Sequence, residues 1–334
     1  MTQAGFRAAL AAAAIATGMA APGAGWAASP AASSWQPGHV EFVVPAGPGA
    51  ALDAAARTLA QLAQQTGKVP AMIVTNRPGG AGVIALNVLE QHPGDGNYLM
   101  TLTSSLLNNQ ILGVVDRDYR DYTPIAKLFD EYVAVVVSAK SPYQTLDALL
   151  KAMRENPAAL NIGVATSIGN HIHVGIAKPL KAAGVDIGKL TIVPYKSSAE
   201  SMTALIGGHL DIVAATTPNL LGPLQAGAIR VLAVSSPQRL QGELASIPTW
   251  REQGVDAVSV SAQGILGPRG MTPQQVAFWD GLLRQVVQTP AWEDVLQRNQ
   301  WRGDYIGPGE VRDYLAREFD GTRAILADLG LVEP

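Results

Sequence analysis

VVPAGPGAALDAAARTLA, residues 43–60, joins an apolar strand to a helix through a turn with two prolines and two glycines, and places Asp53 in the first helical turn. Such a turn exposes the free N–H groups of the helix start, and Gly47 and Gly49 let a ligand approach the backbone. The stretch therefore predicts an α/β fold and a cradle for a small carboxylate. Two simpler interpretations stay open. The glycines and prolines can serve only to connect the strand to the helix, and Asp53 can serve only to cap the helix, without any ligand.

The same alternation of apolar strands and amphipathic helices continues along the whole chain. Units of this kind predict a mostly parallel sheet flanked by helices. We expect strands at 39–46, 71–76, 98–103, 134–139, 160–166, 190–195, 210–216, 229–236 and 260–268. We expect helices at 52–65, 82–91, 145–154, 173–183, 198–207 and 220–225, and an almost wholly helical end at 273–331.

Composition narrows the functional classes. The 334 residues are 48% hydrophobic and 15% charged, and this length predicts two domains. A formal net charge of -3 provides no basic face, so nucleic acid is excluded as a partner. The chain has no cysteine, which excludes disulfides, cysteine nucleophiles and cysteine-type zinc sites.

The first 27 residues have the pattern of a secretory signal peptide. Arg7 precedes an alanine-rich apolar run at 8–21, and small residues lead to a cleavage site after Ala27. An uncleaved membrane anchor is the alternative, but the run is short and only weakly hydrophobic. We therefore expect an exported, periplasmic and soluble protein.

Two strand segments could carry the chain from one lobe to another. AVVVSAKSP, residues 134–142, and VLAVSSP, residues 231–237, both end in small polar residues and a proline. This predicts a discontinuous first domain at 36–136 and 234–334 and a second domain at 137–233. A single large sheet, or two lobes in sequence, are the alternatives.

The glycine-rich turn recurs in three further places. TNRPGGAGVIALNVL (75–89), TSIGNHIHVGIAK (166–178) and VPYKSSAESMTAL (193–205) each leave a strand and enter a helix, and Ser197 and Glu200 have the spacing of a capping box. Four such turns in a chain poor in catalytic groups favour a receptor that holds a small acid with backbone dipoles and short hydroxyls.

The histidines do not indicate a metal or a catalytic centre. His171 and His173 are two residues apart, so their side chains would point to the same side only if this segment were a strand. No other His or carboxylate lies close by in sequence to complete a metal site. We expect His173 to be a capped or buried residue at a helix start, and His171 to be a hydrogen-bonding neighbour of the ligand. A secreted hydrolase that pairs Ser167 with either histidine is the alternative from another class, but the chain lacks a G-x-S-x-G elbow. No catalytic residue, metal or cofactor is expected.

The order of the motifs resembles a known family. VVPAGPGAALDAAARTLA, NRPGGAG, PGDGNYLMTLTSS, VPYKSSAESMTALIGGHLDIVAATTPN, LQAGAIRVLAVSS, IPTWREQG and GILGPRGMTP occur in the order seen in the Bug receptors, the periplasmic solute-binding proteins of tripartite tricarboxylate transporters. The resemblance covers residues 39–334. It implies a two-lobed type II periplasmic-binding-protein fold that closes on a small carboxylate and is not an enzyme. It also implies a monomer that serves the membrane components of a tripartite transporter, or alternatively a membrane sensor.

The resemblance also implies where the ligand binds. The ligand loops of the family correspond to three regions of this sequence: the first turn, the turn after the third strand, and turns of the second lobe. These are Gly47, Gly49, Ala50, Ala51, Leu52 and Asp53, then Ser104 and Ser105, then Ser167, Gly169, Asn170, Ser197, Ser198, Thr216 and Thr217. The turn pattern adds Thr166 and His171, and Ala46 stands where the family usually has an aromatic residue.

The first turn also departs from the family pattern. GAALD replaces a glycine-rich run that usually ends in Thr-Asp, so Leu52 removes a hydroxyl, while Ala50 and Ala51 restrict the backbone. We therefore expect an aromatic or partly apolar acid as the ligand, less polar than citrate or aspartate.

Overall fold

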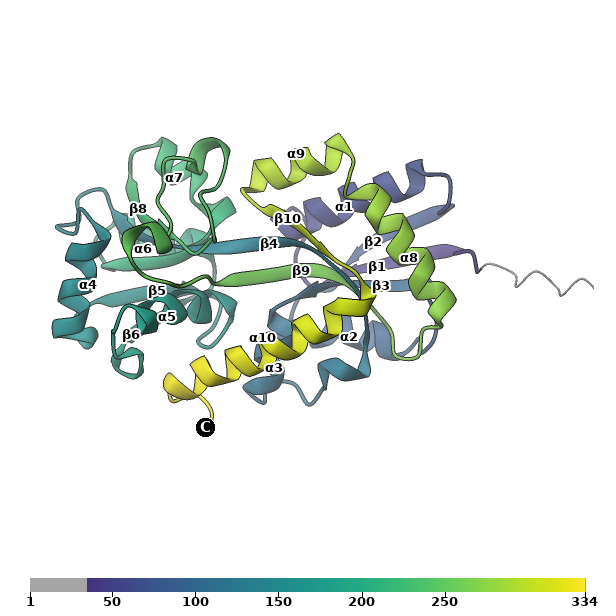
Figure 1. The fold of residues 1–334 in the computed structure, drawn as a ribbon, viewed down its shortest axis with the longest axis horizontal. Helices are drawn as coiled ribbons and strands as arrows, with labels where there is room; N and C mark the ends of the chain where they lie inside the picture. Colours follow the sequence, from purple (N-terminus) through teal and green to yellow (C-terminus); the bar gives the residue numbers. More distant parts are fainter. Residues whose placement is uncertain (1–34, 334) are drawn as a thin grey trace, which may run out of the picture. The chain divides into compact units, whose positions relative to one another are not determined.

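The computed structural model describes residues 35–333, so the expected signal peptide at 1–27 lies outside the described residues. Within the described part, strands and helices alternate as the pattern predicts (Figure 1). The strands are β1 (His39–Val44), β2 (Ala71–Asn76), β3 (Tyr98–Thr103), β4 (Thr123–Ser138), β5 (Asn161–Ala165), β6 (Thr191–Tyr195), β7 (Ile212–Thr216), β8 (Ile229–Val234), β9 (Val260–Gly267) and β10 (Arg302–Ile306). The α-helices are α1 (Ala51–Gln65), α2 (Val83–Glu90), α3 (Ser105–Ile111), α4 (Leu146–Glu155), α5 (His171–Ala182), α6 (Ser198–Ile206), α7 (Leu221–Gln225), α8 (Pro273–Val286), α9 (Pro290–Asn299) and α10 (Pro308–Asp328).

Each lobe contains a parallel set of three strands. In the first lobe, β1 lies between β2 and β3, and all three are parallel; in the second lobe, β5 lies between β6 and β7 in the same way. The other four strands, β4, β8, β9 and β10, make antiparallel pairs. The expected parallel arrangement thus holds for the two strand sets, and antiparallel strands extend both.

Strand β4 connects the two lobes. Its residues 123–132 pair with β9, and its residues 133–138 pair with β7 and β8, so one continuous strand belongs to both lobes (Figure 1). The sequence predicted a strand only over 134–139, because charged residues interrupt the apolar pattern before it. Lys127 is nevertheless buried, since its Nζ lies 2.6 Å from Asp130 Oδ1 and also bonds to Asp304. The expected domain boundaries at 137 and 233 stay a prediction.

The C-terminal part also differs from its prediction. Strand β10 interrupts the expected all-helical end, because Gln300 adopts a left-handed conformation with φ 57° and stops α9. Helix α3 was not expected either. Helix α10 packs against α3 and β4 in the first lobe and against α5 in the second (Figure 1). None of the helices within 35–333 is long and apolar enough to span a bilayer.

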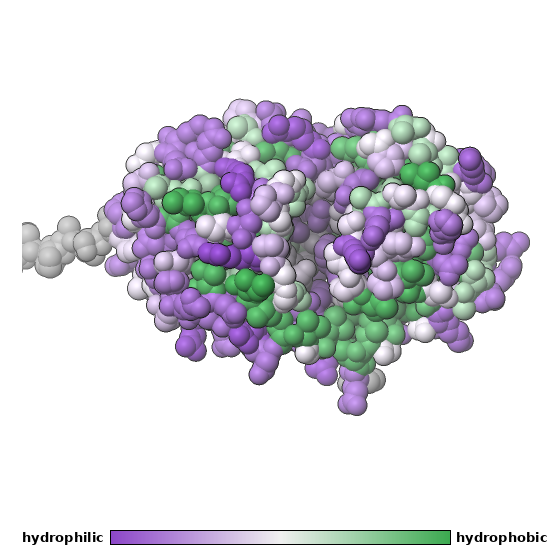
Figure 2. All heavy atoms as spheres, turned by 180° about the vertical axis from the view of Figure 1, so that it is seen from behind, coloured by the Kyte–Doolittle hydropathy of each residue, from purple (hydrophilic) through white to green (hydrophobic). Residues whose placement is uncertain are grey.

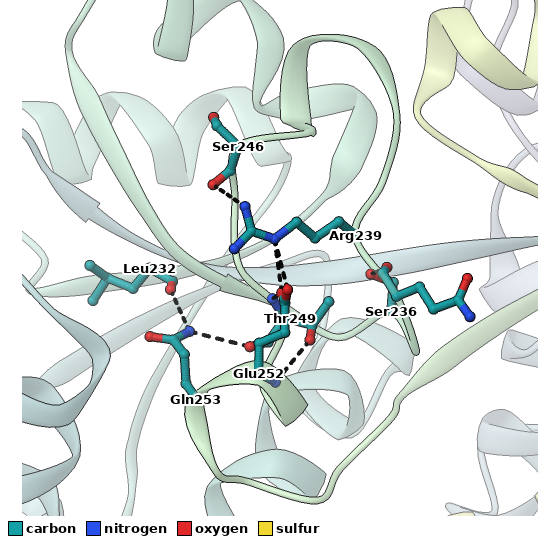
Figure 3. A network of polar contacts seen from close by, with 8 residues as sticks. Leu232, Ser236, Arg239, Ser246, Thr249, Glu252 and Gln253 are labelled. Carbon is teal, nitrogen blue, oxygen red and sulfur yellow. Dashed lines mark hydrogen bonds and ion pairs between the residues drawn. The ribbon is translucent and has the colours of Figure 1, made fainter.

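A polar network fixes the segment that leads from β8 back to β9 (Figure 3). Arg239 Nε lies 2.9 Å from Glu252 Oε1, and Glu252 Oε2 accepts the backbone N–H of Thr249 at 2.8 Å. Gln253 Nε2 donates to the carbonyl of Leu232 on β8 at 3.0 Å. The segment is thereby held against the second lobe before β9 enters the first.

Candidate functional site

A cavity of about 550 Å³ lies between the lobes, and Figure 2 shows the surface hollowed between them. Its lining comes from both lobes and from β4, β9 and the segment before β10. Seven of the predicted site residues line it: Ala51, Leu52, Ser105, Thr166, Ser167, Asn170 and His171. A volume of this size suits a small-molecule ligand.

The loop after β1 brings the start of α1 to the cavity. Ala51 and Leu52 line it, and α1 makes its first backbone bond from Ala54 N to Ala50 O at 3.0 Å. The N–H groups that precede Ala54 therefore have no partner within the helix. Together with the positive end of the helix dipole, they form the type of site that binds a carboxylate.

Asp53 holds this loop in place instead of lining the cavity. It is 2% exposed and accepts hydrogen bonds from Gly49 N at 2.9 Å, Arg57 Nε at 3.1 Å and Asn76 Nδ2 at 2.8 Å. Burial raises the pKa of Asp53, but the bonds from Arg57, Gly49 and Asn76 outweigh it and lower the pKa below its usual value. Asp53 is thus an ionised brace. Ala46, Gly47, Gly49 and Ala50 do not line the cavity.

The loop after β5 brings the start of α5 to the same cavity. Asn170 caps α5, since its Oδ1 accepts the N–H groups of Ile172 and His173, both at 3.0 Å. Its Nδ2 donates to Ala165 O at 2.6 Å and to Thr166 Oγ1 at 2.9 Å. Thr166 has φ 68°, a left-handed conformation that is uncommon outside glycine and often marks a functional site.

Both histidines belong to the first turn of α5, where a spacing of two residues points them to different sides. His171 lines the cavity, whereas His173 is 2% exposed and accepts the N–H of Gly169 at Nδ1, at 3.0 Å. Burial lowers the pKa of each to about 4. Both are therefore neutral at pH 7. The capped, buried His173 that the sequence predicted is confirmed.

The turn after β3 has two serines with different roles. Ser105 lines the cavity, while Ser104 Oγ accepts the N–H of Ala262 on β9 at 3.0 Å. One turn further, Asn108 Nδ2 donates to Gly169 O at 2.9 Å, and this buried bond joins the two lobes at the edge of the cavity. Gly169 itself does not line the cavity.

Four predicted residues of the second lobe lie elsewhere. Ser197 caps α6 by accepting the N–H of Glu200 at 3.2 Å, and neither it nor Ser198 lines the cavity. Thr217 Oγ1 donates to Gln300 O at 3.2 Å, which is a contact between the lobes. Thr216 does not line the cavity, but it accepts a bond from Asn219 Nδ2 at 2.8 Å and hydrogen-bonds to Glu131, which does.

The floor of the cavity is formed by residues that were not predicted from the sequence: Thr101, Glu131, Gln263 and Trp301. Glu131 lies on β4, Gln263 on β9 and Thr101 on β3, so the floor consists of the strands that meet between the lobes. Burial raises the pKa of Glu131 to about 7, although hydrogen bonds from Trp301 and Thr216 lower it. The sequence offers one indication of this part of the site, because the carboxyl of Glu131 interrupts the apolar run LFDEYVAVVV, residues 128–137.

The walls of the cavity are largely apolar. Leu52 lines the cavity with side chains from the first lobe and from β9: Leu86, Met100, Leu102, Leu106 and Leu266. A ligand with hydrocarbon surface would be desolvated against these walls.

Comparison with known proteins gives consistent results. The family model described as the tripartite tricarboxylate transporter family receptor matches residues 55–331. A relative from Cupriavidus necator, the UPF0065 protein in the gbd 5' region, is 26% identical over 98% of this chain and 97% of its own length.

Two solved structures share the fold. An R. palustris protein with adipate has a TM-score of 0.73 at 24% identity and covers 89% of this chain and 98% of its own. MatC from Rhodopseudomonas palustris with bound malate has a TM-score of 0.69 at 20% identity and covers 86% of this chain and 99% of its own. The two-lobed periplasmic-binding fold predicted from the sequence is confirmed.

Proposed function

This chain belongs to the family of tripartite tricarboxylate transporter receptors, and from that premise we propose that its cavity captures a small carboxylate for uptake. The observation that carries the proposal is that α1 and α5, from opposite lobes, both begin at the cavity. Two helix N-termini can bind one anion or the two ends of a diacid. A ligand that contacts both lobes would favour the closed arrangement.

The ligand we propose is a small acid with an apolar or aromatic body. Solved relatives hold adipate and malate, which are both small carboxylic acids. The apolar walls around Leu52 favour a hydrocarbon chain or ring between the polar ends.

The protein acts, in this proposal, as a monomeric receptor without enzymatic turnover. The hydrolase alternative would need a histidine free to accept a proton from Ser167. His173 Nδ1 already accepts the N–H of Gly169, so His171, which lines the cavity with Ser167, would have to be that base, and the ester assay below tests it. We propose that the receptor is exported through a signal peptide at 1–27 and works in the periplasm with the membrane components of a tripartite transporter. A receptor that signals to a membrane sensor instead is the second possibility.

The two-lobe proposal includes the domain division at 137 and 233. The lobes would rotate about β4 and the segment before β9, and the bond from Asn108 Nδ2 to Gly169 O would hold the closed arrangement.

A thermal-shift screen over carboxylic acids tests the function. Ligand at 100 times its Kd adds about 2.7 kcal/mol to the free energy of unfolding, so a cognate acid should raise Tm clearly. We expect adipate and aromatic acids to raise Tm more than citrate does, and generic esters to remain unhydrolysed. A panel in which no acid raises Tm would overturn the proposal.

A pair of variants tests the role of the first turn. Leu52→Thr should shift the preference toward more polar acids, because Leu52 lines the cavity. Ala50→Gly is the matched control, since Ala50 lies in the same turn but is exposed and does not line the cavity. An unchanged ligand profile in Leu52→Thr would contradict the apolar-ligand proposal.

A further inference from the structure

The floor of the cavity carries polar side chains with hydrogen-bonding atoms that the fold leaves unpaired. Gln263 is 6% exposed and Thr101 is 3% exposed, yet both line the cavity. Gln263 Oε1 and Thr101 Oγ1 have no hydrogen-bond partner among the described residues. A buried polar atom without a partner is energetically costly, so such atoms at a cavity indicate where a ligand group can form hydrogen bonds.

Glu131 lies beside them, and its carboxyl oxygens also have room for further hydrogen bonds. Its Oε1 accepts a bond from Trp301 Nε1 at 3.3 Å, and its Oε2 accepts one from Gln263 Nε2 at 3.5 Å. Both distances exceed the usual range for N–H···O bonds, and the third partner of the carboxyl is Thr216. A carboxylate has about four acceptor positions on its two oxygens, so Glu131 can accept a further donor.

The orientation of the Gln263 amide follows from the same contacts. Its Nε2 faces Glu131 Oε2 and also lies 3.3 Å from Ser261 Oγ. The opposite orientation would place the amide oxygen against the carboxyl oxygen, which is repulsive when Glu131 is ionised. The free atom of Gln263 is therefore an acceptor, and the floor offers acceptor oxygens from both Gln263 and Glu131.

We propose that this floor, made by Glu131, Gln263 and Thr101, is a subsite for a hydrogen-bond donor on the ligand, either a hydroxyl or an amino group. The inference rests on the proposed function and deepens it: the ligand is a hydroxy or amino acid whose carboxylate lies at a helix start and whose donor group reaches the floor. An apolar segment between the two groups would contact Leu102 and Leu266.

Electrostatics favours a donor over a second carboxylate at the floor. Two carboxylates in contact repel each other, and one would have to take up a proton. A hydroxyl or ammonium would instead supply the strong hydrogen bond that Glu131 lacks. The raised pKa of Glu131, about 7, fits a carboxyl whose desolvation outweighs its hydrogen bonds from Trp301 and Thr216.

Four six-carbon acids test the subsite by isothermal titration calorimetry of the full chain at pH 7.5. They are hexanoate, 6-hydroxyhexanoate, 6-aminohexanoate and adipate, which differ only at the end remote from the shared carboxylate. We expect the hydroxy and amino acids to bind at least tenfold more tightly than hexanoate.

Variants assign the effect to the floor. Glu131→Gln keeps the shape of the side chain and should reduce the preference for 6-aminohexanoate over hexanoate to under threefold, while its thermal melting without ligand shows whether the variant is folded. Glu155→Gln, a change at an exposed glutamate of α4, should leave all four affinities unchanged.

The outcomes separate the inference from the function. Binding of hexanoate or adipate without any gain from the donor group overturns the subsite and leaves the receptor function standing. A donor preference that survives Glu131→Gln overturns the assignment to Glu131. Failure of all four acids, and of every acid in the wider screen, overturns the proposed function and the inference together.

Discussion

The loops after β1 and β5 bring helices from opposite lobes to one cavity, but they are held in chemically different ways. The first is fixed by Asp53, a buried carboxylate that accepts bonds from Gly49, Arg57 and Asn76. The second is fixed by Asn170 and His173, which are neutral groups. The first loop thus depends on a charge, and the second depends on an amide and an imidazole.

The difference matters for a site that binds an anion. The negative charge of Asp53 is compensated by Arg57, whose Nη2 lies 3.0 Å from Asp53 Oδ1, so the carboxylate can lie behind the loop without repelling a bound acid. The brace of the second loop carries no charge at pH 7. It nevertheless contains a titratable group, so we expect the two loops to respond differently to pH.

The largest effect should come from Asp53→Ala. This change leaves the Gly49 N–H and the Asn76 amide without their acceptor, and it should lower the free energy of unfolding by about 3–4 kcal/mol in urea denaturation. Ligand affinity should also fall, because the start of α1 is no longer held. Asp147→Ala is the control, since Asp147 occupies the first turn of α4 but is exposed; it should cost under about 1 kcal/mol. Equal losses in both variants would show that Asp53 only complements the helix dipole.

The second-largest effect on stability should come from lowering the pH, which acts on the second loop. Burial holds the folded-state pKa of His173 at about 4, below the ordinary value of 6.5, so the unfolded chain binds more protons between these values. Stability from this group is present above pH 6.5 and is lost as the pH falls toward 4, by about 3 kcal/mol.

The variant His173→Asn isolates this contribution. The side-chain carbonyl of an asparagine can accept the N–H of Gly169 in place of the imidazole, and it does not titrate. Urea denaturation at pH 7 and pH 4 should show a smaller loss in the variant than in the unchanged protein. Identical pH profiles would mean that His173 is already accessible to solvent and protons in the folded state.

The cap of the second loop should give a smaller effect. Asn170→Ala removes the acceptor for the N–H groups of Ile172 and His173, and should cost about 2 kcal/mol and weaken ligand binding. Thr145→Ala removes the cap of α4, where Thr145 Oγ1 accepts the N–H of Ala148 at 3.2 Å. That control should cost about 1 kcal/mol and leave ligand affinity unchanged, because α4 does not reach the cavity. Unchanged affinity in both would contradict the role of α5 in binding.

The fold was largely predictable because its periodicity is local. Strands such as 71–76 and 98–103 and helices such as 198–207 follow from apolar spacing and from capping residues next to them. The prediction failed where a distant partner decides the structure. The first part of β4 is a buried strand only because Lys127 finds Asp130 and Asp304, which lie on β4 itself and on β10.

The candidate site was predictable in its rim and not in its floor. The turns at 43–53 and 166–171 carry glycine and short polar residues that point to a ligand from sequence alone. The floor assembles from β3, β4, β9 and the residue before β10, which lie far apart along the chain. Which turn residues face the cavity and which brace the loop also depends on tertiary contacts, as Asp53 and Thr217 show.

The smallest predicted effect concerns backbone conformation, where the two loops differ once more. The first loop uses glycine at its left-handed position, Gly49 with φ 82°, whereas the second uses Thr166 with φ 68°. A Cβ at Gly49 would meet no atom within 4 Å, so Gly49→Ala tests conformational strain alone and should cost about 1 kcal/mol. Gly47→Ala is the matched control, because Gly47 also has open space but lacks a positive φ, and its stability in urea should change by less than about 0.5 kcal/mol. If both variants are equally stable, the first loop can relax, and the strain at Thr166 then distinguishes the second loop as the more rigid side of the cavity.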